Sequence, residues 1–232
     1  MGEMIEIAAL DGDGIFNAYL AEPKGAPKAA IIVIQEIFGV NPGIRKKADD
    51  WAAKGYLALA PDMFWRFKPG YDVDPDVPEQ MKDAFEVRKQ FDADKGVADV
   101  EACLREARAR IGGGKVGVVG FCLGGSVAYL AATRTDADAS VGYYGGQIAQ
   151  SLGEAHAIAR PLMLHFGGED AHITPDIVAT IRAALEGNAH VAIHDYPGVG
   201  HGFADTFGIR RDEAAAQHAD ARTESFFEAA LA

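Results

Sequence analysis

The 232-residue chain has few cysteines, no excess of positive charge and no long apolar run, and each absence excludes a class of protein. Its two cysteines, Cys103 and Cys122, cannot form a disulfide framework. A net charge of −12 argues against nucleic acid or an anionic membrane as a partner, because both need basic patches. No apolar run approaches the length of a membrane span, and the N-terminus has no signal-peptide pattern. We therefore expect a cytoplasmic protein.

The rest of the composition is that of an ordinary globular domain, with 49% hydrophobic and 24% charged residues. A chain of this length buries a large core without disulfides or metals, and it shows no repeat or linker. We predict one domain over residues 1–232, and a monomer. No histidine pair has the spacing of metal ligands on a helix, so neither a metal nor another cofactor is expected.

Strand-like and helix-like segments alternate along the chain. Asp11–Gly14 separates two strand-like runs, Met4–Ala9 and Ile15–Ala21, which is typical of a hairpin. Ala29–Ile34 is a continuous β-branched run, as in buried parallel strands. Further strands are expected at 56–60, 115–119, near 141, at 161–166 and at 191–196, and helices at 44–54, 77–91, 95–111, 126–134, 175–186 and 211–231. This alternation predicts an α/β fold with a mostly parallel central sheet, helices on both faces and an N-terminal antiparallel hairpin.

The most informative segment is Gly120-Phe121-Cys122-Leu123-Gly124-Gly125, which joins a predicted strand to a predicted helix. A sharp strand-to-helix turn with glycine on both sides presents a nucleophile at its tip, usually in the pattern G-x-S-x-G. Here cysteine replaces the serine, which predicts that Cys122 is a nucleophile. The alternative is a glycine-rich turn that happens to carry a cysteine. Cys103 lies on the apolar face of a predicted helix and is expected to be a packing residue.

A cysteine nucleophile needs a base, and the base needs an acid to orient it. In an open parallel sheet, ligands bind at the carboxyl ends of the strands. His201 lies in a glycine-rich loop after the last predicted strand, and Asp170 follows the strand at 161–166. Glu169 is the nearest rival for the acid, and His172 could border the site. The order nucleophile, acid, histidine is that of the α/β-hydrolase fold.

An oxyanion hole needs two backbone N–H groups that point at the developing negative charge. Leu123, which follows the nucleophile, is expected to supply one of them. Ile37, in the loop after the strand at 29–34, is expected to supply the other. Glu36 lies in the same loop, at the tip of a buried strand, and is either a surface residue or a member of the site.

These residues resemble the dienelactone hydrolases (carboxymethylenebutenolidases), and the resemblance covers essentially the whole chain. It rests on the segments Gln35–Gly39, Gly120–Gly125, Val141–Gly145, Gly167–Asp170 and Gly200–Ala204. It implies hydrolysis of a small ester or lactone through a cysteine acyl-enzyme, with Cys122, His201 and Asp170 as the triad. It also implies that Glu36 is the active-site glutamate, linked to the resting thiol until substrate binding releases it. Tyr144 matches a tyrosine near the family's site.

The sequence departs from the family where two arginines would recognise a substrate carboxylate. One of these positions, four residues after the histidine, is Asp205, and the other falls near Met81. Phe85 replaces an expected tyrosine, and Arg88 or Arg66 could supply the missing cation. The residues expected to bind substrate are Phe38, Met81, Lys82, Phe85, Arg88, Tyr144, Phe203 and Asp205.

The sequence thus predicts a hydrolase that cleaves a small ester or lactone, with a role in aromatic catabolism if the substrate is a dienelactone. One alternative function, favoured by Asp205 and Met81, is that of a carboxylesterase with a different acyl preference. A rival from another class is a non-catalytic redox-sensing or binding protein in which Cys122 is a reactive thiol.

Overall fold

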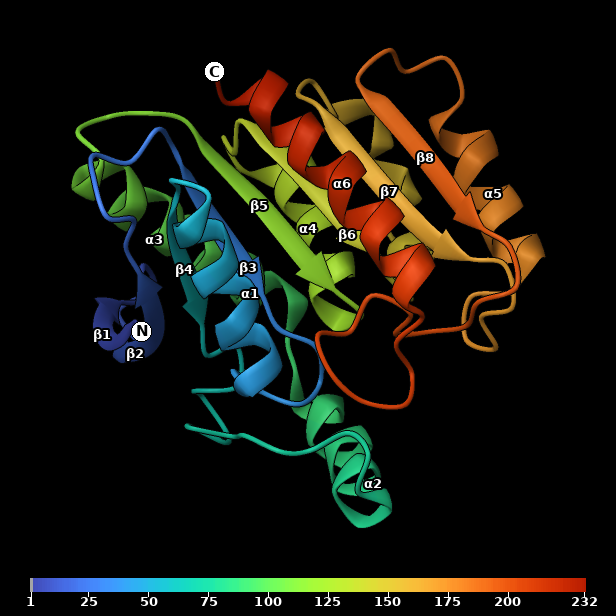
Figure 1. Cartoon of the computed structure of the whole chain (residues 1–232), viewed down its shortest axis with the longest axis horizontal. Helices are drawn as coiled ribbons and strands as arrows, with labels where there is room; N and C mark the ends of the chain where they lie inside the picture. Colours follow the sequence, from blue (N-terminus) through green and yellow to red (C-terminus); the bar gives the residue numbers. More distant parts are fainter. Residues whose placement is uncertain (1) are drawn as a thin grey trace.

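Eight strands form one sheet, in the order β1-β2-β4-β3-β5-β6-β7-β8, within residues 2–232, which the computed structural model describes (Figure 1). The β1–β2 and β2–β4 pairs are antiparallel, and the other neighbouring pairs are parallel. This confirms the predicted mostly parallel sheet with an N-terminal hairpin. The strands are β1 (Glu3–Ala8), β2 (Ile15–Ala21), β3 (Ala30–Ile34), β4 (Leu57–Pro61), β5 (Val116–Phe121), β6 (Ala139–Tyr143), β7 (Leu162–Gly167) and β8 (Val191–Tyr196).

Helices cover both faces of the sheet. The α-helices are α1 (Pro42–Ala53), α2 (Pro78–Val87), α3 (Ala93–Arg110), α4 (Leu123–Arg134), α5 (Pro175–Leu185) and α6 (Glu213–Ala230). The short 3-10 helices are η1 (Arg88–Gln90), which directly follows α2, and η2 (Ile148–Gln150) and η3 (Leu152–Ala157), which lie between β6 and β7. In Figure 1, α1 and α6 lie in front of the sheet and α3, α4 and α5 behind it, whereas α2 lies beyond the strand ends to which the arrows point. None of the helices in the described chain combines the length and apolarity needed to span a membrane.

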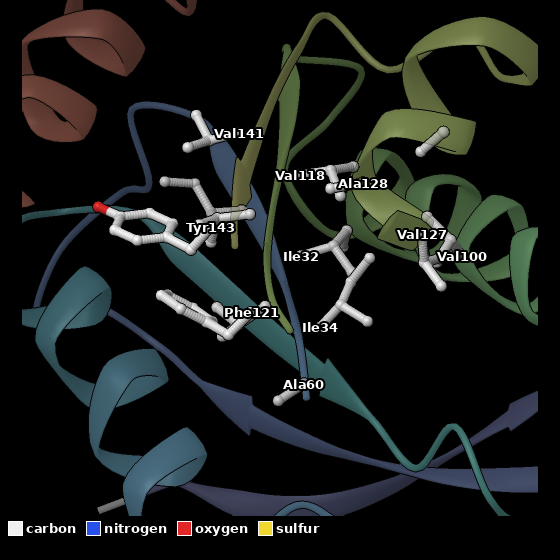
Figure 2. Close-up of a cluster of buried hydrophobic side chains, with 14 of the residues drawn as sticks. Ile32, Ile34, Ala60, Val100, Val118, Phe121, Val127, Ala128, Val141 and Tyr143 are labelled. Atoms are coloured by element: carbon white, nitrogen blue, oxygen red, sulfur yellow. The ribbon is translucent and has the colours of Figure 1, made fainter. Parts of the chain in front are cut away.

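Side chains along the central strands alternate between the two faces of the sheet. Figure 2 shows Ile32, Ile34 and Val118 directed toward α3 and α4, while Phe121 and Tyr143 point to the opposite face. All five residues of β3 are buried, as expected for a parallel strand covered on both sides. The sheet is therefore the centre of the core, and its carboxyl ends are held in fixed positions.

Local signals explain where several helices begin. The side chain of Asn41 accepts a hydrogen bond from the amide of Ile44 at 3.1 Å and so caps α1, with Pro42 as the first residue of the helix. Asp92 and Asp212 cap α3 and α6 in the same way. Each cap satisfies amides that lack a partner within the helix, which fixes the point where the chain turns.

Four elements differ from the sequence-based expectation. The helix expected over 77–91 ends as an α-helix at Val87 and continues as the 3-10 turn η1. α4 begins at Leu123 rather than at residue 126, so its first turn includes two glycines that disfavour helix. The 3-10 helices η2 and η3 were not expected, because no apolar period marks them.

Candidate active site

Cys122 is the single residue between the end of β5 and the start of α4. Its φ of 54° lies in the left-handed region, which is strained for a residue with a side chain. A Cβ on Gly120 would lie 1.9 Å from the carbonyl oxygen of Gly124, and one on Gly124 would lie 2.5 Å from that of Ile34. Glycine at both positions is therefore what allows the turn to close and to present the thiol.

His201 and Asp170 lie beyond the ends of β8 and β7 and are joined by a hydrogen bond. His201 Nδ1 is 2.7 Å from Oδ2 of Asp170, which is only 3% exposed. The other carboxylate oxygen, Oδ1, accepts the amides of His172 and Ile173 at 2.8 and 3.1 Å. These bonds fix the carboxylate, and the carboxylate in turn fixes the imidazole, whose Nε2 is left for Cys122.

Electrostatics at the pair favour a protonated imidazole. Burial lowers the pKa of His201, but the negative charges of Cys122 and Asp170 and the hydrogen bonds to both residues outweigh burial and raise it to about 10. Burial raises the pKa of Asp170, whereas the bonds from His201, His172 and Ile173 lower it, and the net shift is downward. The site therefore suits an imidazolium placed between a carboxylate and a thiolate.

Two free amides lie at the same end of the sheet. A backbone hydrogen bond of 3.1 Å from Gly124 N–H to Gln35 C=O ties the turn after β5 to the loop after β3. Within residues 2–232, the amides of Ile37 and Leu123 donate to no protein acceptor. Both residues line one cavity together with Cys122. This is the arrangement needed to bind an oxyanion.

Tyr144 lies directly behind the histidine. Its φ of 38° is again left-handed, and its side chain is fully buried. The ring centroid is 5.0 Å from that of His201 and 5.5 Å from that of Phe203, which is itself fully buried. Tyr144 and Phe203 therefore support the imidazole from the protein interior and do not line the cavity.

The cavity in front of Cys122 has a volume of about 550 Å³. Met81 and Phe85 of α2 and Arg88 of η1 form part of its wall, with Phe38 from the loop after β3. Lys82, also in α2, is exposed and lies outside the lining. Arg66 is also outside it and is paired with Asp11 and Asp99. The remaining wall residues are Ser126, Gly146, Gln147, Gln150, His172, His201 and Arg210.

Arg210 is a residue of the site that sequence reasoning missed. Its guanidinium lies over the ring of Phe38, 4.9 Å from the centroid, and Nη2 is 2.5 Å from Oδ2 of Asp205 and 3.4 Å from Oε2 of Glu36. Asp205 is 6% exposed and lies behind Arg210, away from the cavity. Asp205, where the resemblance led us to expect an arginine, is therefore the partner of an arginine five residues further along.

No group of three His, Cys, Asp or Glu side chains in the described residues is arranged to hold a metal ion. The parallel sheet, the turn at Cys122, the His–Asp pair from neighbouring strand ends and the two free amides together define an α/β-hydrolase.

Comparison with known proteins identifies the family within this class. Residues 16–231 match the model of the dienelactone hydrolase family. The chain is 35% identical over 224 residues to carboxymethylenebutenolidase 1 of Cupriavidus pinatubonensis, covering 96% of this chain and 95% of that protein. It is 36% identical over 225 residues to the carboxymethylenebutenolidase of Pseudomonas putida, covering 97% and 95%.

A crystal structure from Klebsiella pneumoniae is also similar, with a TM-score of 0.87 and 29% identity over 98% of each chain. The chain therefore belongs to the dienelactone hydrolase family. It is a carboxylic ester hydrolase that acts on a small-molecule ester or lactone.

Proposed function

We propose that this hydrolase works through a cysteine acyl-enzyme, with Cys122 as nucleophile, His201 as acid and base, and Asp170 as the group that orients His201. The observation that carries the proposal is the position of Cys122 at a strained, glycine-flanked turn, next to a partly buried histidine whose Nδ1 is bonded to a carboxylate. A helix N-terminus and an imidazolium both stabilise a thiolate, which is the reactive form of cysteine.

The reaction proceeds in two halves. The Cys122 sulfur attacks the carbonyl carbon, and the oxyanion is bound by the amides of Ile37 and Leu123. The C–O bond then breaks, and the leaving oxygen takes the proton from His201 Nε2, which leaves a thioester. In the second half His201 accepts a proton from water, the water oxygen attacks the thioester, and the C–S bond breaks to release the acid and restore the thiolate.

The charges of the cavity point to a substrate that carries a carboxylate. Arg88 and Arg210 both line the cavity, and Arg88 forms no ion pair within residues 2–232. A guanidinium recognises a carboxylate through two parallel hydrogen bonds, which also orients the ligand. Asp205 lies behind Arg210, so its charge is shielded from a ligand in the cavity. We therefore propose an ester or lactone with a free carboxylate, in which Arg88 and Arg210 take the place of the family's two arginines.

The mechanism is tested with the chain's two cysteines as a matched pair. Cys122→Ala should abolish hydrolysis of an aryl ester and of a dienelactone, with the circular dichroism unchanged. Cys103→Ala should keep most of the activity, because Cys103 is fully buried in α3 and burial raises the pKa of its thiol. Mass spectrometry of the enzyme stopped during turnover should find the acyl group on Cys122. Substantial hydrolysis by the Cys122→Ala enzyme contradicts the proposal.

A further inference from the structure

Two buried carboxyl groups meet at Arg210, behind the cavity wall, and neither takes part in the two half-reactions. Glu36 is 7% exposed and Asp205 is 6% exposed, and both contact the same nitrogen, Nη2 of Arg210. Because both contact this one nitrogen, the two carboxyl groups are neighbours, and the proximity of Glu36 raises the pKa of Asp205. In the described chain, Oε1 of Glu36 has no hydrogen-bond partner, and Oδ2 of Asp205 has none apart from its ion pair with Arg210. Two charged carboxylates leave Oε1 of Glu36 without a donor, whereas one proton between the groups supplies one.

The surrounding charges do not balance two full negative charges. Arg210 is the cation in contact with both carboxyls. Lys47 of α1 donates to the carbonyl oxygen of Ala204 at 2.9 Å, and burial lowers its pKa despite the attraction of Asp220, Asp205 and Glu36. Arg211 donates to the backbone oxygen of Asp205 at 2.6 Å and pairs with Glu213. One proton on the carboxyl pair makes the unit with Arg210 neutral.

Tyr144 is a further neighbour of the pair, and it donates a hydrogen bond to Asp205. The hydroxyl of Tyr144, at the end of β6, lies 3.4 Å from Oδ1 of Asp205, and the ring is buried. Cys122 is close enough to act on both Tyr144 and Arg210, and the ring of His201 packs against that of Tyr144. Burial and the charge of Glu36 together outweigh Arg210 and raise the pKa of Asp205 to about 8.

We propose that Asp205 is a positioning residue that shares one proton with Glu36, so that the two carboxyls carry a single charge, balanced by Arg210, next to the nucleophile. The inference rests on the proposed function, because it concerns the same site. The shared proton fixes the Glu36 side chain and keeps a second negative charge away from the oxyanion formed at Ile37 and Leu123. When the proton is lost at higher pH, the added charge opposes formation of that oxyanion.

The test is the pH dependence of kcat/KM for a neutral aryl ester, which has no carboxylate to contact Arg210. The wild-type enzyme should lose activity about tenfold between pH 7 and pH 9, as a group with a pKa of about 8 ionises. In Asp205→Asn, whatever its activity at pH 7, this decrease should be absent, and activity should fall only near pH 10, where His201 loses its proton. Asp99→Asn is the matched control: Asp99 is also a buried carboxyl paired with an arginine, Arg66, but lies outside the cavity, so the decrease should remain.

A second measurement does not depend on turnover. The infrared difference spectrum of the wild-type protein between pH 7 and pH 9 should show the loss of a protonated-carboxyl C=O band. That change should be absent from Asp205→Asn and present in Asp99→Asn. If the wild-type protein shows no such band, or if the activity decrease survives in folded Asp205→Asn, the shared proton is ruled out. Failure of the acyl-enzyme proposal is a separate result, because it shows in Cys122→Ala and leaves the infrared titration unaffected.

Discussion

His201 Nδ1 lies 2.7 Å from Oδ2 of Asp170, and the other oxygen of that carboxylate is held by two backbone amides. The imidazole can therefore take only one orientation, with Nε2 toward Cys122. Neither residue is near the other in sequence: one follows β7 and the other follows β8, and their contact depends on the parallel pairing of these strands.

Asp170→Asn should lower kcat/KM by about a thousandfold or more, because an amide in place of the carboxylate no longer stabilises the imidazolium and favours the wrong tautomer. Steady-state hydrolysis of an aryl ester measures the effect. The control is Glu169→Gln, which changes the adjacent, exposed carboxylate and should leave kcat/KM nearly unchanged. If kcat/KM fell equally in the two variants, Asp170 would not be the residue that orients His201.

His201 should remain protonated in the folded enzyme up to about pH 10, as its raised pKa requires. Cys122→Ala removes the largest of the causes that raise this pKa, so the imidazole should titrate at clearly lower pH in that variant. NMR of the histidine side chain measures both values. Titration near the ordinary value of about 6.5 in the wild-type protein would contradict the ion pair.

The same shift makes stability depend on pH. A group whose pKa is higher in the folded than in the unfolded protein takes up a proton on folding. The contribution of His201 is therefore complete below about pH 6.5 and is lost as the pH rises through about 10. The free energy of unfolding of the wild-type protein minus that of His201→Gln, from urea titrations, should fall over this interval. A difference that is constant with pH would show that folding leaves the pKa of His201 unchanged.

Gly124→Ala should destabilise the protein by roughly 1–3 kcal/mol and abolish most activity, because the added Cβ would lie 2.5 and 2.6 Å from the carbonyl oxygens of Ile34 and Gln35. Urea denaturation and ester hydrolysis measure the two effects. Gly153→Ala is the matched control, since a Cβ at Gly153 would meet nothing within 4 Å. Retained activity in Gly124→Ala would mean that the turn tolerates a side chain.

Arg88→Met should lower kcat/KM for a carboxylate-bearing lactone about ten- to a hundredfold, the value of one lost charge-assisted hydrogen bond. Hydrolysis of a neutral ester should change little, and the ratio of the two rates is the quantity to compare. Lys82→Met removes a positive charge from the same helical segment, but outside the cavity, and should leave that ratio unchanged. If Arg88→Met also leaves it unchanged, Arg88 does not bind the substrate carboxylate.

The layered fold could be predicted from the sequence because its signals are local. Ala29–Ile34 is apolar throughout and forms a buried central strand, and Asp11–Gly14 marks the turn of the hairpin. The start of α4 could not be placed in this way. Gly124 and Gly125 disfavour helix, yet both are needed because a side chain on either would meet the backbone of a neighbouring strand or of the loop that follows it.

The polar centre of the site was predicted in part. The positions of Cys122, Asp170 and His201 follow from a turn motif and from strand ends, both of which are visible in the chain. No sequence pattern marks Arg210 as a site residue, because it lies in a loop and its partner Glu36 is 174 residues away in the sequence. Asp205 was expected at the substrate, but its environment depends on that arginine, so its burial could be known only from the structure.

The wall that selects the ligand and the sheet that holds the nucleophile are separate parts of the chain. Met81, Phe85 and Arg88 belong to α2 and η1, which lie beyond the strand ends and outside the two helical layers (Figure 1). Mutations in this short segment can alter what enters the cavity while β5, β7 and β8 stay intact. Divergence among duplicated genes of this kind should therefore concentrate there, so that new specificities arise without the loss of folding that limits change in a core.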